Sequence, residues 1–291
     1  MNGKTGGNGG KVLLMVAPNG ARLGKEDHPA LPLTAEELAA DARACLDAGA
    51  AAIHLHVRDG RGGHTLAAAP MRRALAAVKR ATGGRMIIQM TSEAVGIYSA
   101  AEQMAAVRAV EPPAVSIALR ELAPDDDERT LGRFGDFLAW LARAGISPQF
   151  ILYSPADAAR FNRLRAQGII PQSRPLVLFV LGYHGARSGR AADMAPFVEA
   201  LENGEAGVEN GEAAEWMVCA FGPHLGEIAI ETAALGGHLR VGFENGLDLP
   251  GGGPAPDNAA IVAAVRELLA RNGHSLMDPA AAAALFARAA R

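Results

Sequence analysis

Two histidines separated by a single residue, His54 and His56, form the pattern with the clearest chemistry in the sequence. Side chains alternate across a β-strand, so a strand here would place both imidazoles on one face and Leu55 on the other. Neutral imidazole is a good zinc ligand, and the pair therefore predicts a metal site. Two hydrogen-bonded core histidines would give the same spacing, and that interpretation stays open at this point.

A carboxylate that could complete such a site lies far along the chain, at Glu244. The segment 238–245 predicts a strand on which Arg240, Gly242 and Glu244 share one face. Two histidines and one carboxylate leave a coordination position open on zinc, as in catalytic rather than structural sites. Such a positively charged centre would attract an anionic substrate and polarise its carbonyl group. The alternative is a structural ion pair between Glu244 and Arg240.

Further polar side chains could hold the anionic end of a substrate. Thr91 and Ser92 follow an apolar run, Ser116 lies within another, and Arg22 belongs to a long polar segment at 18–33. Serine and threonine after a strand are also common helix caps, and an arginine in a loop is most often solvated. These four residues are candidates for substrate binding.

Short apolar runs alternate with alanine-rich helical segments over most of the chain. The expected strands are 12–17, 52–58, 86–91, 114–119, 148–153, 176–182, 215–221 and 238–243. The expected helices lie between Thr34 and Gly49, with a capping box at Thr34 and Glu37, and near 69–82, 100–110, 131–144, 155–167, 193–203, 224–235 and 256–272. Apolar strands separated by helices indicate a parallel sheet covered by helices, and eight such units predict an α/β fold, the closed (β/α)8 TIM barrel. An open doubly wound sheet is disfavoured because no GxGxxG motif follows the first strand.

A barrel of this kind would bring the candidate residues together. The carboxyl ends of its strands form the rim where active sites are built, and His56 and Glu244 both fall at such ends. We expect a flexible lead at 1–10, one barrel domain at 11–275 and a C-terminal helical extension at 276–291. Extensions of this type pack on the outside of the barrel or on a neighbouring subunit.

Composition limits the class of protein. The 291 residues carry 28 basic and 31 acidic side chains, a formal net charge of −3, and 49% are hydrophobic, as in ordinary globular proteins. The scattered arginines argue against nucleic-acid binding, and the lack of a signal peptide or membrane-spanning run predicts a cytoplasmic protein without a membrane partner. Cys45 and Cys219 show no metal-binding or disulfide spacing, and we expect both to be buried.

The sequence resembles the β-keto acid cleavage enzyme family, which includes 3-keto-5-aminohexanoate cleavage enzyme. The resemblance covers nearly the whole chain and rests on five segments: APNGA at 17–21, DHPALPLT at 27–34, HLHVRD at 54–59, IQMTS at 88–92 and RVGFEN at 240–245. It implies a zinc-containing (β/α)8 barrel that assembles into homo-oligomers, often tetramers. The implied reaction joins a β-keto acid and acetyl-CoA as co-substrate and yields acetoacetate and a new acyl-CoA.

The resemblance also implies a role for each candidate residue. The metal ligands would be His54, His56 and Glu244, the catalytic arginine would be Arg240, and the group that holds the substrate carboxylate would be Thr91 with Ser92. Arginine is a poor base because its pKa exceeds about 12. We therefore expect Arg240 to orient and stabilise anions.

Two positions depart from the family pattern. Arg22 stands where the aminohexanoate enzyme has a glutamate that pairs with the amine of its substrate. An amine would meet a like charge there, so we expect an anionic or neutral polar side chain on the keto acid. Asn245 stands where many members have aspartate, and an amide cannot accept a proton as a carboxylate does. This limits any catalytic role of Asn245 in proton transfer.

Two other functions fit parts of the pattern. Metal hydrolases of the amidohydrolase type carry His-x-His on the first barrel strand and add further histidines, which His184 and His224 could mimic. A barrel that binds a metabolite and a metal without turnover would be compatible with Asn245. Only the cleavage enzyme would form acetoacetate from a β-keto acid and acetyl-CoA.

Overall fold

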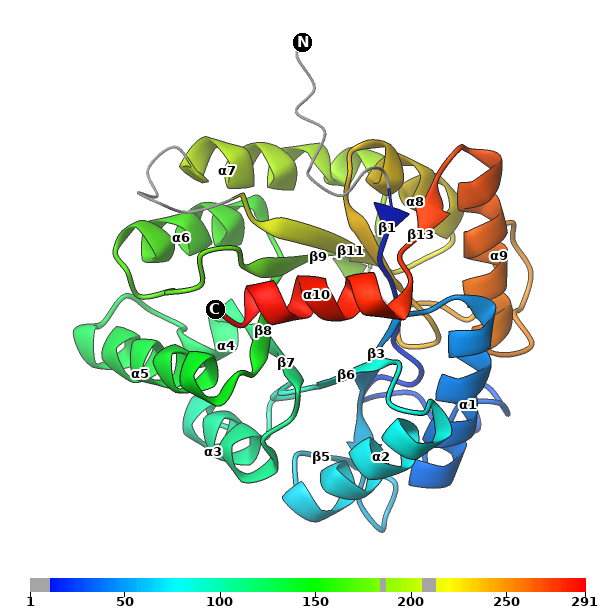
Figure 1. The fold of residues 1–291 in the computed structure, drawn as a ribbon, viewed down its shortest axis with the longest axis horizontal. Coiled ribbons are helices and arrows are strands. Elements are labelled where there is room, and N and C mark those ends of the chain that lie inside the picture. The colour runs from blue at the N-terminus through cyan, green and yellow to red at the C-terminus, as the bar shows by residue number, and fades with distance from the viewer. Residues whose placement is uncertain (1–10, 184–186, 206–212) are drawn as a thin grey trace.

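The computed structural model describes residues 11–183, 187–205 and 213–291. Eight parallel strands close into a barrel, in which β8 pairs with β9 and β12 pairs with β2 (Figure 1). In barrel order they are β2 (Leu14–Val16), β3 (Ala52–Leu55), β6 (Ile87–Met90), β7 (Ala114–Ala118), β8 (Ser147–Leu152), β9 (Leu176–Tyr183), β11 (Glu215–Ala220) and β12 (His238–Val241). The short β10 (Arg187–Ser188) pairs antiparallel with the end of β9. The (β/α)8 barrel expected from the sequence is confirmed.

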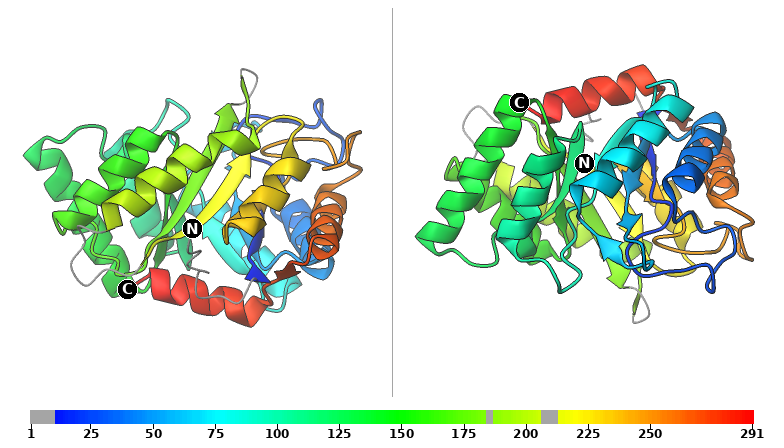
Figure 2. Two further views of the ribbon diagram at one scale, coloured as in Figure 1. Left: turned by 90° about the horizontal axis from the view of Figure 1, so that it is seen from above. Right: turned by 90° about the horizontal axis from the view of Figure 1, so that it is seen from below.

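Helices surround the barrel, as the perpendicular views in Figure 2 show. They are α1 (Ala35–Ala48), α2 (Ala68–Ala81), α3 (Ala100–Val110), α5 (Glu128–Ala144), α6 (Pro155–Ala166), α7 (Ala195–Glu205), α8 (Leu225–Ala234) and α9 (Asn258–Arg271), with the short α4 (Leu119–Leu122) and η1 (Ala191–Asp193) in connections. The capping box that starts α1 is confirmed, because Thr34 Oγ1 accepts the Glu37 N–H at 3.1 Å and Glu37 accepts the Thr34 N–H at 2.9 Å. Among the described residues, no helix has the length and apolar character needed to cross a membrane.

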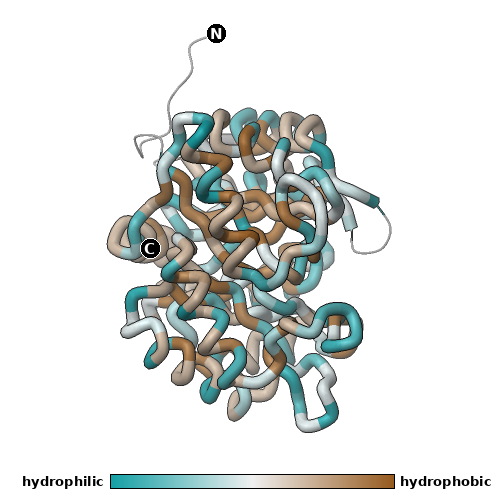
Figure 3. Tube along the Cα trace, turned by 90° about the vertical axis from the view of Figure 1, so that its right-hand side faces the viewer, coloured by the Kyte–Doolittle hydropathy of each residue, from teal (hydrophilic) through white to brown (hydrophobic). Residues whose placement is uncertain are grey.

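Apolar side chains form two layers, because alternate residues of each strand point in opposite directions. Val16, Ile53 and their equivalents on other strands pack outward under the helices. Leu13 and Met15 belong to the second layer, inside the barrel. Figure 3 shows the hydrophobic stretches in the interior and the hydrophilic ones mainly in surface loops. Cys45 and Cys219 are buried free thiols, as expected.

The C-terminal helix α10 (Pro279–Ala289) crosses the amino-terminal end of the barrel, where it appears in red in Figure 1. Its Leu285 and Phe286 join the inner apolar layer together with Met277. The preceding β13 (Ser275–Leu276) pairs with β1 (Lys11–Val12). The extension thus packs on the barrel of its own chain and closes one end, which we call the sealed end.

Two strands end two or three residues earlier than the sequence predicted. The strand expected at 52–58 stops at Leu55, and β4 (Val57–Arg58) instead forms a hairpin with β5 (His64–Thr65). The strand expected at 238–243 stops at Val241 because Gly242 has a φ of +127° and turns the chain. His56 and Glu244 therefore lie just beyond the strands on which we expected them.

Candidate active site and metal centre

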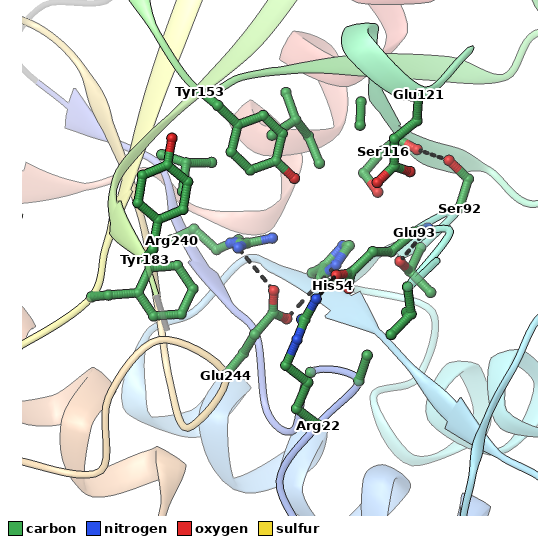
Figure 4. Close-up of a pocket in the computed structure, with 18 of the residues that line it drawn as sticks. Arg22, His54, Ser92, Glu93, Ser116, Glu121, Tyr153, Tyr183, Arg240 and Glu244 are labelled. Carbon is green, nitrogen blue, oxygen red and sulfur yellow. Dashed lines mark hydrogen bonds and ion pairs between the residues drawn. The ribbon is translucent and has the colours of Figure 1, made fainter. Parts of the chain in front are cut away.

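A cavity of about 310 Å³ opens at the carboxyl-terminal end of the barrel, which we call the open end. Loops that follow several strands build its wall, and their side chains project into it (Figure 4). The expected site residues that line it are Arg22, His54, Thr91, Ser92, Ser116, Arg240 and Glu244. His56 is fully buried beside this cavity, and Asn245 does not line it.

His54, His56 and Glu244 come together, with one ligand atom from each lying within 4.8 Å of the others. The two imidazole Nε2 atoms are 3.0 Å apart, and Glu244 Oε2 lies 3.7 Å from that of His54 and 3.5 Å from that of His56. Burial lowers the pKa of His54 to about 3 and the pKa of His56 well below its usual value. Both rings are therefore neutral near pH 7, which is the form that binds a metal ion.

A chain of buried side chains fixes the orientation of the His54 ring. Gln89 Nε2 donates to Gln149 Oε1 at 3.0 Å, so the Gln89 oxygen is left to accept from His54 Nδ1 at 2.7 Å. Gln149 in turn contacts the sulfur of Met217 at 3.5 Å. With its proton on Nδ1, His54 presents the lone pair of Nε2 toward His56 and the Glu244 carboxylate.

Glu244 has one oxygen in an ion pair and one without a partner. Its Oε1 lies 2.9 Å from Arg240 Nη2, so the ion pair considered from the sequence is present. Its buried Oε2 has no hydrogen-bond partner among the described residues. The first loop packs closely against the Glu244 side chain, since a Cβ at Gly20 would lie only 2.6 Å from Glu244 Cγ.

These groups fit a divalent cation. A buried carboxylate oxygen without a donor faces two neutral imidazoles, and buried polar atoms are rarely left unpaired in proteins. Two imidazoles and one carboxylate are the donor set of several catalytic zinc sites. The site residues that would hold the ion are thus His54, His56 and Glu244.

Arg240 is buried and remains a cation. Burial favours a lower pKa, but the neighbouring Cys219 and Glu244 outweigh it and raise the pKa of Arg240 above its usual value. Its Nη2 lies 3.3 Å from Cys219 Sγ. A guanidinium held in this way can stabilise negative charge on a substrate but is a very poor proton acceptor.

The candidate residues for substrate binding differ in how free they are. The Ser92 hydroxyl donates to the Ser116 carbonyl at 2.7 Å, so its proton is already used. Thr91 Oγ1 accepts the Glu93 N–H at 3.0 Å, which leaves its own proton free to donate into the cavity. Arg22 is not simply solvated, since its Nη2 lies 2.9 Å from Glu93 Oε1.

Other sequence candidates lie outside this cavity. Asn245 lines a second, smaller cavity of about 130 Å³ that shares Arg240 with the first. His224 does not line the larger cavity, and its Nδ1 lies 4.0 Å from Glu227 Oε2. It therefore gives no further ligand of the kind a hydrolase would need. His184 lies outside the described residues.

Several polar residues of the cavity were missed by the sequence reasoning. They are Glu93, Arg120, Glu121 and Tyr153, which follow β6, β7 and β8. No motif marks them, and their one available signal is their position at or just after the carboxyl ends of the expected strands. Gln89 and Gln149 were missed for another reason, since only the assembled barrel brings their amides together.

Comparisons with known proteins agree with this geometry. The sequence model of the beta-keto acid cleavage enzyme family matches residues 11–287. The 3-keto-5-aminohexanoate cleavage enzyme of Fusobacterium nucleatum is 28% identical over 274 residues, covering 92% of this chain and 95% of the relative. The 3-oxoadipate:acetyl-CoA acetyltransferase of Cupriavidus necator is 26% identical over 280 residues and is covered to 94%, as is this chain.

Solved structures share the fold. The binary complex of ObcA with oxaloacetate superposes with a TM-score of 0.70 at 18% identity, over 89% of this chain and 67% of that longer one. A Rubisco-like protein from Rhodopseudomonas palustris gives a TM-score of 0.53 at 15% identity, over 93% of this chain and 67% of that chain. At such low identity these likenesses concern the barrel alone. The family match over residues 11–287 shows that the chain belongs to the beta-keto acid cleavage enzyme family.

Proposed function

We propose that this protein is a zinc-dependent enzyme that converts a β-keto acid and acetyl-CoA into acetoacetate and a new acyl-CoA. Membership of the family supports the cleavage reaction, and the relative named 3-oxoadipate:acetyl-CoA acetyltransferase supports acetyl-CoA as co-substrate. The observation that carries the proposal is the convergence of His54, His56 and Glu244 beside a polar cavity at the open end.

The reaction exchanges acyl groups across one carbon–carbon bond. In a β-keto acid R–CO–CH2–COO⁻, the bond between the ketone carbon and the CH2 carbon breaks. The CH2–COO⁻ part becomes bonded to the acetyl carbon of acetyl-CoA and forms acetoacetate. The R–CO group becomes bonded to the coenzyme sulfur, so every atom of the two substrates appears in the two products.

The chain supplies groups for each part of this reaction. A zinc ion held by His54, His56 and Glu244 would supply Lewis acidity that polarises the ketone of the keto acid. The free proton of Thr91 is available to donate to the substrate carboxylate. Arg240, fixed by Glu244, stabilises the negative charge that develops on the substrate as the carbon–carbon bond breaks.

The side chain of the keto acid is anionic or neutral polar in this proposal. The argument from Arg22 alone is weakened by the structure, because Glu93 offsets its charge. The cavity as a whole is lined by three arginines and by three carboxylates, those of Glu93, Glu121 and Glu244, so the formal charges of these side chains balance. With a divalent ion present, the cavity would carry a net positive charge, which favours an anion over an amine.

The test combines metal analysis with a substrate panel. Purified protein is incubated with acetyl-CoA and β-keto acids of equal length that end in a carboxylate, an amide or an amine. We expect about one zinc ion per chain and the formation of acetoacetate and acyl-CoA in equal amounts. A His54→Ala variant should form neither product. Absence of acetoacetate with every keto acid in the panel would refute the proposal.

A further inference from the structure

Two of the three arginines that line the cavity are matched with carboxylates. Arg22 Nη2 lies 2.9 Å from Glu93 Oε1, and Arg240 Nη2 lies 2.9 Å from Glu244 Oε1. The third, Arg120, has no ion pair or side-chain hydrogen bond with any residue in the described part of the chain. It is therefore the cavity arginine whose charge is still available to a ligand.

The guanidinium of Arg120 is held in place by an aromatic ring. Its Cζ lies 3.4 Å from the centroid of the Tyr153 ring. Such stacking uses the face of the guanidinium and leaves the N–H groups along its edge free. Tyr153 itself is half-buried and projects into the cavity in Figure 4. The stack thus presents a row of oriented donors at a fixed place in the wall.

The neighbouring carboxylate, Glu121, is not paired with Arg120. Glu121 Oε2 accepts the backbone N–H of Ala94 at 3.0 Å, and no ion pair joins Glu121 to Arg120. Burial raises the pKa of Glu121 above its usual value and Glu93 acts in the same direction, whereas the Ala94 N–H and the charge of Arg120 act in the opposite direction. Glu121 therefore leaves the guanidinium edge of Arg120 without an ion-pair partner.

Arg120 also stands at an informative place in the barrel. It lies in α4, directly after β7, whereas Arg240 and Glu244 belong to β12 and the turn that follows it. In the closed order of eight strands, β7 and β12 are on opposite sides of the barrel. A substrate whose keto acid end lies at His54 and Glu244 can therefore extend across the cavity toward Arg120.

We propose that Arg120 binds the distal carboxylate of a β-keto dicarboxylic acid and thereby sets the specificity of the enzyme. The inference rests on the proposed function and narrows its substrate to the anionic class. A guanidinium edge can hold a carboxylate through two parallel hydrogen bonds, a geometry that a neutral amide cannot match. The stack on Tyr153 fixes the plane in which these two bonds form.

The kinetic test uses two β-keto acids of equal length, one ending in a carboxylate and the other in a carboxamide. Arg120→Gln should lower kcat/KM for the dicarboxylic acid by about 10- to 100-fold and change kcat/KM for the amide by less than about 3-fold. Arg120→Lys should recover part of the loss. The KM for acetyl-CoA should stay unchanged. Arg143→Gln, the same replacement at an exposed position on α5, should leave both substrates unaffected.

A binding measurement separates this inference from the proposed reaction. By calorimetry, the wild-type protein should bind hexanedioate more tightly than its monoamide, and Arg120→Gln should remove that difference. Equal binding of the two by the wild type, equal kinetic losses for both keto acids, or a change in the KM for acetyl-CoA alone would overturn the role of Arg120. If hexanedioate is preferred but no keto acid yields acetoacetate, the carboxylate site stands and the proposed reaction fails.

Discussion

The sealed and open ends of the barrel use the same strands for different purposes. At the sealed end, Leu13 and Met277 pack with Phe286 of α10 in an apolar layer. At the open end, the inward positions hold charged and hydrogen-bonded groups around a cavity. Strand β3 shows the change over two residues, from Ala52 in the apolar layer to His54 in the candidate metal site. The barrel thus separates the residues that stabilise it from those available for chemistry.

The largest expected effect comes from removing a ligand at the open end. His56→Ala should abolish stoichiometric zinc binding and reduce activity on the order of 1,000-fold, because one of three ligands is lost. Elemental analysis and the acetoacetate assay measure the two effects. Since His56 lies outside the sealed-end layer, the variant should keep the circular dichroism spectrum of the wild type.

The matched control is His274→Ala, at a histidine that does not line the cavity. It should keep full zinc content and activity. A His56→Ala protein that retains one equivalent of tightly bound zinc would contradict the ligand assignment.

A substitution at the sealed end should have the opposite effect, a loss of stability without a loss of zinc or activity. Phe286 is 3% exposed, and Phe286→Ala should lower the free energy of unfolding by about 3–5 kcal/mol through lost burial and a residual cavity. Denaturant unfolding measures this loss. Zinc content and kcat/KM at 25 °C should remain close to wild type. Ala284→Ser, an exposed position on the same helix, is the control and should change stability little. A large loss of zinc in Phe286→Ala would mean that the two ends are coupled.

Between the two ends, the amide chain that orients His54 gives an intermediate effect. Gln149→Leu should weaken zinc binding by about 10- to 100-fold, because Gln89 loses the acceptor that fixes its orientation toward His54. Competition with a chelator measures the affinity. Gln167→Leu, the same replacement at an exposed position after α6, should leave the affinity unchanged. Equal affinities of wild type and Gln149→Leu would show that the Gln89 contact does not depend on Gln149.

Much of this comparison could be predicted from the sequence. The eight apolar runs located all the barrel strands, and the capping residues Thr34 and Glu37 located the start of α1. The spacing of His54 and His56 indicated a shared face, and the family resemblance pointed to Glu244. These signals are local or belong to a motif, and they can therefore be recognised in the sequence without knowledge of the fold.

Other features depend on three-dimensional context. The amides of Gln89 and Gln149 are 60 residues apart in sequence and meet only because β6, β7 and β8 pair in one register. The end of β12 was wrong by two residues, because the pattern of apolar residues does not reveal the positive φ of Gly242. Arg120 was missed because the sequence does not show which arginines form ion pairs in the folded protein and which do not.

A buried carboxyl behind the open end gives the smallest expected effect. Asp41 accepts from Asn258 Nδ2 at 3.3 Å, and Asn258 also accepts the Phe243 N–H at 2.8 Å, next to Glu244. Burial raises the pKa of Asp41 to about 6, and the charge of Asp257 acts in the same direction. The open end is therefore stabilised partly by a carboxyl group whose ionised form is disfavoured by burial. Phe286 at the sealed end carries no charge and has no such pH dependence.

The sign of the pH effect follows from the raised pKa. The folded protein binds the Asp41 proton more tightly than the unfolded chain, so wild-type stability falls as pH rises from about 4 through 6. Asp41→Asn removes this dependence and can keep an oxygen for Asn258. Its unfolding free energy, relative to wild type, should rise by about 1–2 kcal/mol between pH 4.5 and 7.5. Urea unfolding of both proteins at these pH values measures the change. Parallel stability profiles would mean that Asp41 has the same pKa in the folded and unfolded states. Ionisation of Asp41 would then not reduce the stability of the folded protein.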